Sequence, residues 1–118
     1  MIIELSSEWT PTQREFDLFA QISGDDNPIH VDPEFSARTA FGRTVSHGML
    51  IYAKLWGLLI AAHPEVSQKG QTMMFPNPCY TGEPVDLVIS GECPGTLLVR
   101  AVRSADGAEL LVGEAEVA

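Results

Sequence analysis

The sequence predicts an α+β fold in which an antiparallel sheet wraps around one long helix. The run from Gly48 to His63 is apolar at almost every position, which is typical of a helix that is buried nearly all round. Short apolar-rich segments follow this run, separated by turns rich in proline and glycine, as in a series of strands. The chain has 118 residues, the usual size of one domain, so residues 1–118 are expected to form a single domain.

The part of the chain before the long helix is expected to hold one strand and two short helices. Met1–Trp9 alternates weakly between apolar and polar residues, as a strand does. A helix then begins after Thr12, because residues 12–15 have the form of a capping box, and it stops at Gly24. The spacing of its apolar residues predicts a buried face made of Phe16, Phe19, Ala20 and Ile22.

Residues 23–33 are dense in glycine, aspartate, asparagine and proline, which predicts a turn-rich loop. A short helix over residues 33–38 follows, with Asp32 as its N-cap and Pro33 at its first position. After the long helix, four strands are expected in hairpin order, and Asp106-Gly107 is the clearest hairpin turn. Their expected ranges are 71–75, 85–90, 96–103 and 109–117.

The composition excludes two classes of partner. Sixteen acidic residues stand against seven basic ones, for a formal charge of −9, so a nucleic-acid backbone would be repelled over most of the surface. The longest apolar run, Met49–Ala62, is interrupted by Lys54 and falls short of the roughly 20 residues that span a bilayer. We therefore expect neither a nucleic-acid partner nor a membrane anchor.

The first residues and the cysteines favour a cytoplasmic protein. The N-terminus lacks the basic start and long apolar core of a secretory signal, so the cytoplasm is the expected compartment. Cys79 and Cys93 are the only cysteines, and two are too few to staple a domain of this size, so both are expected to be free thiols. His30 and Asp32 form a His-x-Asp pair, but the spacing supplies no third and fourth ligand, so no metal site is expected.

The loop over residues 23–32 is the first candidate site. It carries Asp25 and His30 on a backbone that Gly24 and Pro28 bend, where side chains can converge on a small ligand. A carboxylate and an imidazole can together hold one water, which is the arrangement needed to add water to a double bond or to remove it. The structural alternative is that the Asp and Asn residues form turns and that His30 is a packed loop residue.

The start of the long helix, at Ser46-His47-Gly48, is the second candidate site. A helix N-terminus presents unpaired N–H groups and a partial positive charge, and glycine lets a ligand oxygen approach the amide closely. Gly48 is therefore a candidate donor to a developing oxyanion. The structural alternative is that Ser46 caps the helix and Gly48 permits close packing of the helix on the sheet.

Together the two segments resemble the motif of the MaoC-like dehydratases and (R)-specific enoyl-CoA hydratases. That motif reads F-x-x-x-S-G-D-x-N-P-[LI]-H-x-D and is followed by H-G-M; here it begins at Phe19, and His47 follows His30 by 17 residues. The resemblance covers nearly the whole chain, because the family's later F-x-x-P-V-x-x-G-[DE] stretch is similar to Phe75, Pro76, Pro78 and residues 82–85.

The resemblance implies a hot-dog fold and a hydro-lyase. The implied reaction is the reversible hydration of a trans-2-enoyl thioester to the (R)-3-hydroxyacyl thioester, in fatty-acid, hydroxyalkanoate or polyketide metabolism. The acyl chain would be carried by coenzyme A or by an acyl carrier protein, and no cofactor is implied. Asp25 and His30 would be the catalytic pair, and the Gly48 amide would polarise the thioester carbonyl. The remaining residues implied to bind substrate are Asn27, Ser46, His47 and Trp56.

The chain departs from the family at one position of the long helix. Some of these hydratases carry a serine hydroxyl there, whereas this chain has Trp56. Its indole is expected either to shape the acyl tunnel with Leu59 and Met49 or to be an ordinary core residue. The family is built of dimers, so a homodimer is expected, with a heterodimer as the other possibility.

Two other functions remain as alternatives. One is a non-catalytic hot-dog subunit that binds acyl groups or pairs with an active partner. The presence of Asp25, His30 and Gly48 together argues against it, because a silent subunit has no need of all three. The other is a thioesterase on the same fold, whose carboxylate would normally lie on the long helix, but residues 48–62 contain no Asp or Glu.

Overall fold

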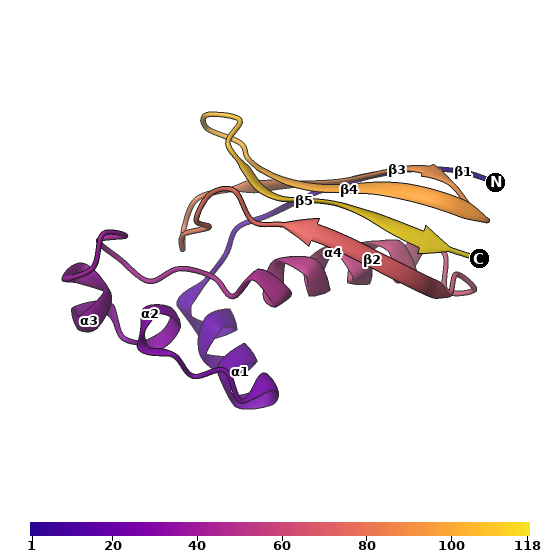
Figure 1. Cartoon of the computed structure of the whole chain (residues 1–118). Helices are drawn as coiled ribbons and strands as arrows, with labels where there is room; N and C mark the ends of the chain where they lie inside the picture. Colours follow the sequence, from indigo (N-terminus) through magenta and orange to yellow (C-terminus); the bar gives the residue numbers. More distant parts are fainter.

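One antiparallel sheet lies against one long helix, and three short helices gather at one end of this pair (Figure 1). The computed structural model describes all 118 residues. Both chain ends lie at the opposite end of the sheet from the short helices (Figure 1). The elements are β1 (Ile2–Trp9), α1 (Gln13–Ser23), α2 (Pro28–Val31), α3 (Pro33–Ala37), α4 (Gly48–Ala62), β2 (Gln68–Met74), β3 (Val85–Glu92), β4 (Gly95–Arg103) and β5 (Glu109–Val117). This arrangement confirms the predicted α+β class.

The sheet has five strands in the order β1-β3-β4-β5-β2, and every neighbouring pair is antiparallel. The expected β4–β5 hairpin is present, and Gly107 at its turn has a φ of 75°, a conformation that glycine adopts without strain. The expected hairpin between β2 and β3 is wrong, because β2 pairs with β5 at one edge while β3 pairs with β1. The proline-rich connection over residues 75–84 therefore carries the chain across the sheet.

The core lies between the sheet and one face of α4. Alternate residues of the central strands are buried on this side, as expected for a sheet with one covered face. They are Val85, Leu87 and Ile89 in β3 and Leu97, Val99 and Ala101 in β4. The buried residues of α4 are Leu50, Ile51, Leu55 and Leu59.

The expectation that α4 is buried nearly all round is wrong for the single chain. Met49 is 50% exposed, Ala53 and Gly57 are exposed, and Tyr52 and Trp56 are half-buried. These residues recur every three or four positions and so form one apolar side of the helix that no other element of the chain covers. We call this side the open face of α4.

The length and the apolar character that a membrane-spanning helix needs do not occur together in any helix of this chain.

Helix α1 begins and ends as its sequence predicts. Thr12 accepts a hydrogen bond from the Glu15 amide, and the Glu15 carboxylate accepts one from the Thr12 amide, which completes the capping box. Gly24 ends the helix with a φ of 80°. Phe16 and Ala20 are buried as expected and Phe19 is half-buried, but Ile22 is 83% exposed. At 3.6 residues per turn, Ile22 lies about 120° round the helix from Phe16 and about 160° from Ala20, so it points away from the core.

The Glu15 carboxylate also connects α1 to its neighbours. It lies 3.1 Å from the Trp9 indole nitrogen of β1 and 2.6 Å from Lys54 Nζ of α4. Partial burial alone would raise the pKa of Glu15, but the hydrogen bonds from Lys54, Trp9 and Thr12 outweigh it and lower the pKa. Lys54, the charge that interrupts the apolar run, is thus the residue that joins α1 to α4.

Candidate active site

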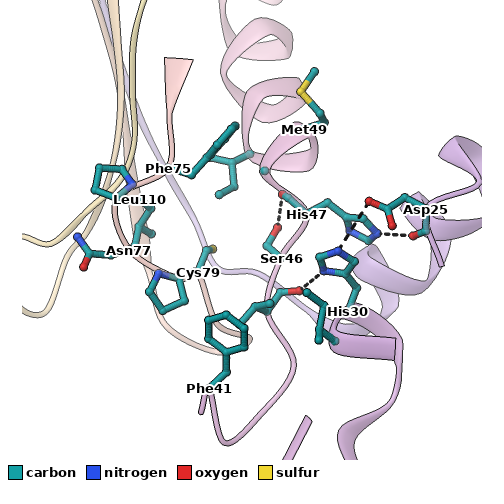
Figure 2. Close-up of a pocket in the computed structure, with 16 residues that line it drawn as sticks. Asp25, His30, Phe41, Ser46, His47, Met49, Phe75, Asn77, Cys79 and Leu110 are labelled. Atoms are coloured by element: carbon teal, nitrogen blue, oxygen red, sulfur yellow. Dashed lines mark hydrogen bonds and ion pairs between the residues drawn. The ribbon is translucent and has the colours of Figure 1, made fainter. Parts of the chain in front are cut away.

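A pocket of about 470 Å³ opens at the N-terminal end of α4. Its polar side holds Asp25, His30 and His47, and its other side holds Phe75, Cys79, Asn77 and Leu110 (Figure 2). The two sides come from segments far apart in the chain, which the crossing connection after β2 brings together. A mostly apolar hollow with a few convergent polar groups is the usual form of a small-molecule site.

Asp25 occupies a tight turn between α1 and α2. The Asp25 amide donates a hydrogen bond to Ser23 Oγ at 3.1 Å, and Ser23 Oγ donates in turn to the Phe19 carbonyl at 2.7 Å. These two bonds fix the Asp25 backbone against the last turn of α1. The side chain is 56% exposed, so it stands at the mouth of the pocket.

His30 lies on α2, a one-turn helix inside the segment expected to be a loop. Asn27 caps this helix by accepting a hydrogen bond from the Ile29 amide at 3.1 Å, and Pro28 takes the first position. Aspartate, asparagine and proline thus act here as helix-start residues and not only as turn residues. The loop prediction is wrong for residues 28–31, although the turn around Asp25 is present.

Polar contacts that the sequence did not reveal hold α2 in place. Gln13 donates to the His30 carbonyl at 2.8 Å and accepts from Thr44 Oγ1 at 2.7 Å. The fully buried Ser36 donates to the Ile29 carbonyl at 3.2 Å. These are single polar residues without a characteristic spacing, so no sequence pattern could have identified them.

The His30 and Asp25 side chains face each other across a short gap. His30 Nδ1 lies 2.7 Å from the Val45 carbonyl oxygen, and because a carbonyl only accepts, Nδ1 carries the proton. The free nitrogen, Nε2, lies 3.8 Å from Asp25 Oδ2. This distance is too long for a direct hydrogen bond, but a water molecule between the two atoms could bond to both.

The first residues of α4 line the pocket next to Asp25 and His30. Gly48 is the first residue of the helix, so its amide has no acceptor within the helix. A Cβ at this position would lie 2.7 Å from the Phe75 ring, so any larger residue would force that ring to move. The expected cap at Ser46 is wrong: the N-cap residue is His47, and Ser46 Oγ donates to the His47 carbonyl at 2.9 Å.

His47 is the residue that links the two candidate sites. Its Nε2 lies 2.8 Å from the Asp25 carbonyl oxygen, and its ring stacks on the His30 ring with centroids 3.8 Å apart. It is only 2% exposed. Burial lowers the pKa of His47, and the neighbouring His30 lowers it further, whereas the hydrogen bond to the Asp25 carbonyl and the Asp25 carboxylate act in the opposite direction.

The structure gathers most, but not all, of the residues singled out in the sequence. Asp25, His30, Ser46, His47 and Gly48 all line the pocket. Asn27 caps α2 but is exposed and lies outside the pocket lining. Trp56 also lies outside the lining, on the open face of α4, where its ring stacks on the Tyr52 ring with centroids 6.5 Å apart. Met49 lines the pocket, whereas Leu59 is in the core.

The opposite wall of the pocket is largely apolar and was only partly foreseen. Phe75, Pro76 and Pro78 were quoted for the resemblance alone, and Phe41, Asn77 and Leu110 were not identified. The wall includes Cys79, whose thiol pKa burial raises to about 12. A thiol with this pKa is protonated at neutral pH and is a poor nucleophile. Both cysteines are free, as expected.

Asp25, His30 and His47 also form the one cluster of the chain with three possible metal-ligand atoms, which lie within 4.8 Å of one another. The sequence did not predict this third group. However, carbonyl oxygens already engage one nitrogen of each histidine, and the two rings are within 24° of parallel. Rings stacked in this way do not direct their remaining nitrogens to one point, as a tetrahedral ion requires. Asp32 is not part of the cluster, because it caps α3.

Comparison with known proteins matches the chain to one family. Residues 3–102 match the family model described as MaoC like domain. The chain is 34% identical over 110 residues to the (R)-specific enoyl-CoA hydratase of Aeromonas caviae, covering 87% of this chain and 82% of that protein. It is 31% identical over 75 residues to a mitochondrial 3-hydroxyacyl-[acyl-carrier-protein] dehydratase of Arabidopsis thaliana, covering 63% of this chain and 45% of that protein.

Solved structures give the same result for the fold. The (R)-hydratase from A. caviae involved in PHA biosynthesis superimposes with a TM-score of 0.89 at 33% identity, over 98% of this chain and 93% of that one. The expected hot-dog fold is therefore confirmed, with α4 as the helix around which the sheet wraps.

Proposed function

The chain belongs to the MaoC-like domain family, and from this membership we propose that it is a hydro-lyase acting on enoyl thioesters. It adds water across the C2=C3 bond of a trans-2-enoyl thioester to give the (R)-3-hydroxyacyl thioester, or removes the water in the reverse direction. The observation that carries the proposal is the pair of His30 Nε2 and Asp25 Oδ2, which face each other at 3.8 Å on the rim of an apolar pocket.

The hydrogen bonds around His30 support a role in proton transfer. Because Nδ1 donates to the Val45 carbonyl, the lone pair of Nε2 is directed to the side where Asp25 lies. A water held by both groups has one acceptor for its proton and a second that fixes its orientation. Asp25 and His30 together handle the water at C3 and the proton at C2 on one face of the substrate.

The amide of Gly48 supplies the second requirement of the reaction. Negative charge develops on the thioester oxygen when water adds at C3 in hydration, or when C2 loses its proton in dehydration. The first amide of a 15-residue helix is unpaired and lies at the positive end of the helix dipole. A fixed donor of this kind is worth about 10²–10³-fold in rate. Ser46 and His47 lie next to it in the pocket lining.

The test is a hydration assay with purified protein. Crotonyl and longer trans-2-enoyl thioesters, on coenzyme A and on an acyl carrier protein, should lose their enoyl absorbance, and the product should be the (R) enantiomer by chiral analysis. The carrier has to be varied because one relative's name specifies CoA and the other's specifies an acyl carrier protein. Absence of turnover with every chain length on both carriers would contradict the proposal and favour a non-catalytic acyl-binding subunit.

The open face of α4 supports a homodimer. Met49, Tyr52 and Trp56 are apolar groups along one side of the helix that the single chain leaves uncovered, and contiguous apolar patches of this kind mark interaction sites. A second copy covering this face would complete the wall beside Met49, which belongs to both the face and the pocket.

Charge on the open face should therefore separate the two copies. We expect the Trp56→Glu variant to elute and scatter light as a monomer, whereas the unaltered protein behaves as a dimer. Leu98→Glu is the matched control, because Leu98 is also a large, 51% exposed apolar residue but lies on the outer face of the sheet. A monomeric unaltered protein, or a Trp56→Glu variant that remains dimeric, would contradict the assignment of this face.

A further inference from the structure

The His47 ring contacts two other rings, one on each of two neighbouring elements. The His30 ring stacks on it at 3.8 Å between centroids, and the Phe19 ring lies 4.9 Å away with a tilt of 57°. The three rings come from three different elements: Phe19 from α1, His30 from α2 and His47 from the N-cap of α4. The orientation of the His30 ring is thus fixed by the Val45 carbonyl at one nitrogen and by the plane of His47 along one face.

The same side chain holds the other member of the pair. His47 Nε2 lies 2.8 Å from the backbone carbonyl oxygen of Asp25, so Nε2 must carry the proton and donate it. This bond ties the turn that carries the Asp25 carboxylate to the start of α4. Figure 2 shows the His47 ring beside both residues, with its bond to the Asp25 backbone, the bond of His30 to Val45 and the His30–Asp25 pair drawn as dashed lines.

We propose that His47 is a positioning residue that sets the distance between Asp25 and His30 and does not itself bind the substrate or carry a proton. This inference rests on the proposed hydro-lyase function. It differs from the substrate-binding role that the family resemblance implies for this residue, because every strong contact of the ring is to the other two residues or to Phe19.

The surroundings of His47 keep the ring neutral. Its second nitrogen, Nδ1, is buried and has no hydrogen-bond partner, so a proton placed there would be a buried charge without an acceptor. The ionisable groups that face the ring are His30 and Asp25, and Phe19 on α1 is uncharged. A neutral His47 adds no repulsion to a positive charge on the neighbouring His30 ring, whereas a charged His47 would oppose protonation of His30.

Three substitutions separate the two contacts of His47. His47→Ala removes both, His47→Phe keeps the stacked ring, and His47→Gln keeps an N–H donor. We expect His47→Ala to lower kcat by about 10²-fold, the usual cost of misplacing a catalytic group, with KM unchanged and the other two variants in between. His63→Gln is the control, because His63 lies at the far end of α4. A rise in KM with kcat retained would overturn the proposal.

A second measurement uses the unaltered protein and so does not depend on how the variants fold. NMR of the imidazole nitrogens resolves only three histidines, and His63→Gln identifies one of them. Between about pH 5 and 8, where free histidine titrates, His47 should keep one protonated and one bare nitrogen. A second proton on His47 in this range would overturn the proposal. Lack of turnover by the unaltered protein would instead count against the hydro-lyase function, and the NMR result would still stand.

Discussion

Replacing Asp25 by asparagine is expected to lower kcat by about 10²–10⁴-fold, the range for removing a general acid–base group. Asparagine has almost the same shape and still offers an oxygen to the Asn27 amide, which lies 3.5 Å from Asp25 Oδ1. The turn should therefore survive while the charge is lost. Initial rates with the best enoyl thioester, together with a thermal unfolding curve, measure the two effects separately.

The neighbouring carboxylate provides the control for this substitution. Asp26 is exposed, lies outside the pocket lining and occupies a variable position of the family motif. Asp26→Asn changes the net charge by the same amount as Asp25→Asn, which makes it a matched control. Because Asp26 lies outside the pocket, its substitution should leave kcat almost unchanged. His30→Ala should resemble Asp25→Asn, and the double variant should lose little more than either single one, because groups that act as a unit are not additive. Equal activity of the two asparagine variants would remove Asp25 from the catalytic pair.

Gly48→Ala is expected to obstruct the backbone amide at the start of α4. The alanine Cβ would lie 2.7 Å from the ring carbons of Phe75, and a contact this short forces the ring to move. Phe75 is 45% exposed, so its ring can swing without unfolding the protein. The displaced ring and the added methyl group would then crowd the approach to the Gly48 amide, and we expect kcat/KM to fall by about 10²-fold.

A second glycine provides the control for this effect. Gly70 lies in β2, outside the pocket and the open face of α4, and a Cβ there would meet nothing within 4 Å. Gly70→Ala should therefore leave activity intact and raise stability by about 0.5–1 kcal/mol. Phe75→Ala in the Gly48→Ala background distinguishes the two causes of the loss. Recovery of activity would attribute it to the ring, and no recovery would attribute it to the methyl group at the amide. Full activity of Gly48→Ala alone would contradict both explanations.

The sequence predicted most accurately the features that depend on contacts between residues close together in the chain. The capping box at Thr12, the end of α1 at Gly24 and the cap at Asp32 depend on residues a few positions apart, and each was predicted from the sequence. The cap at Asn27 is equally local but was expected only as part of a loop. The pairing of Asp25 with His30 was predictable for a similar reason, because one tight turn separates them.

The features that were missed depend on contacts between distant segments. Nothing within residues 68–74 indicates that this strand pairs with the last strand of the chain and not with the next one. The apolar run of α4 gave no sign of its open face, because an apolar side that awaits a partner has the same composition as one that is buried. His47 was noticed as part of a motif, but its contacts with Asp25 and His30 exist only after the loop and the helix have come together.

The pocket divides its two tasks between two stretches of the chain. The carboxylate, the two imidazoles and the Gly48 amide lie within residues 25–48, whereas residues 75–79 and Leu110 form the opposite, largely apolar wall. Asp25, His30 and His47 are held by hydrogen bonds among residues 13–47, and no side chain of the wall donates a hydrogen bond to Asp25 or His30. Selection can therefore remodel the length or bulk of acyl chain that is accepted by changing the second stretch, while the reaction itself is inherited unchanged with the first.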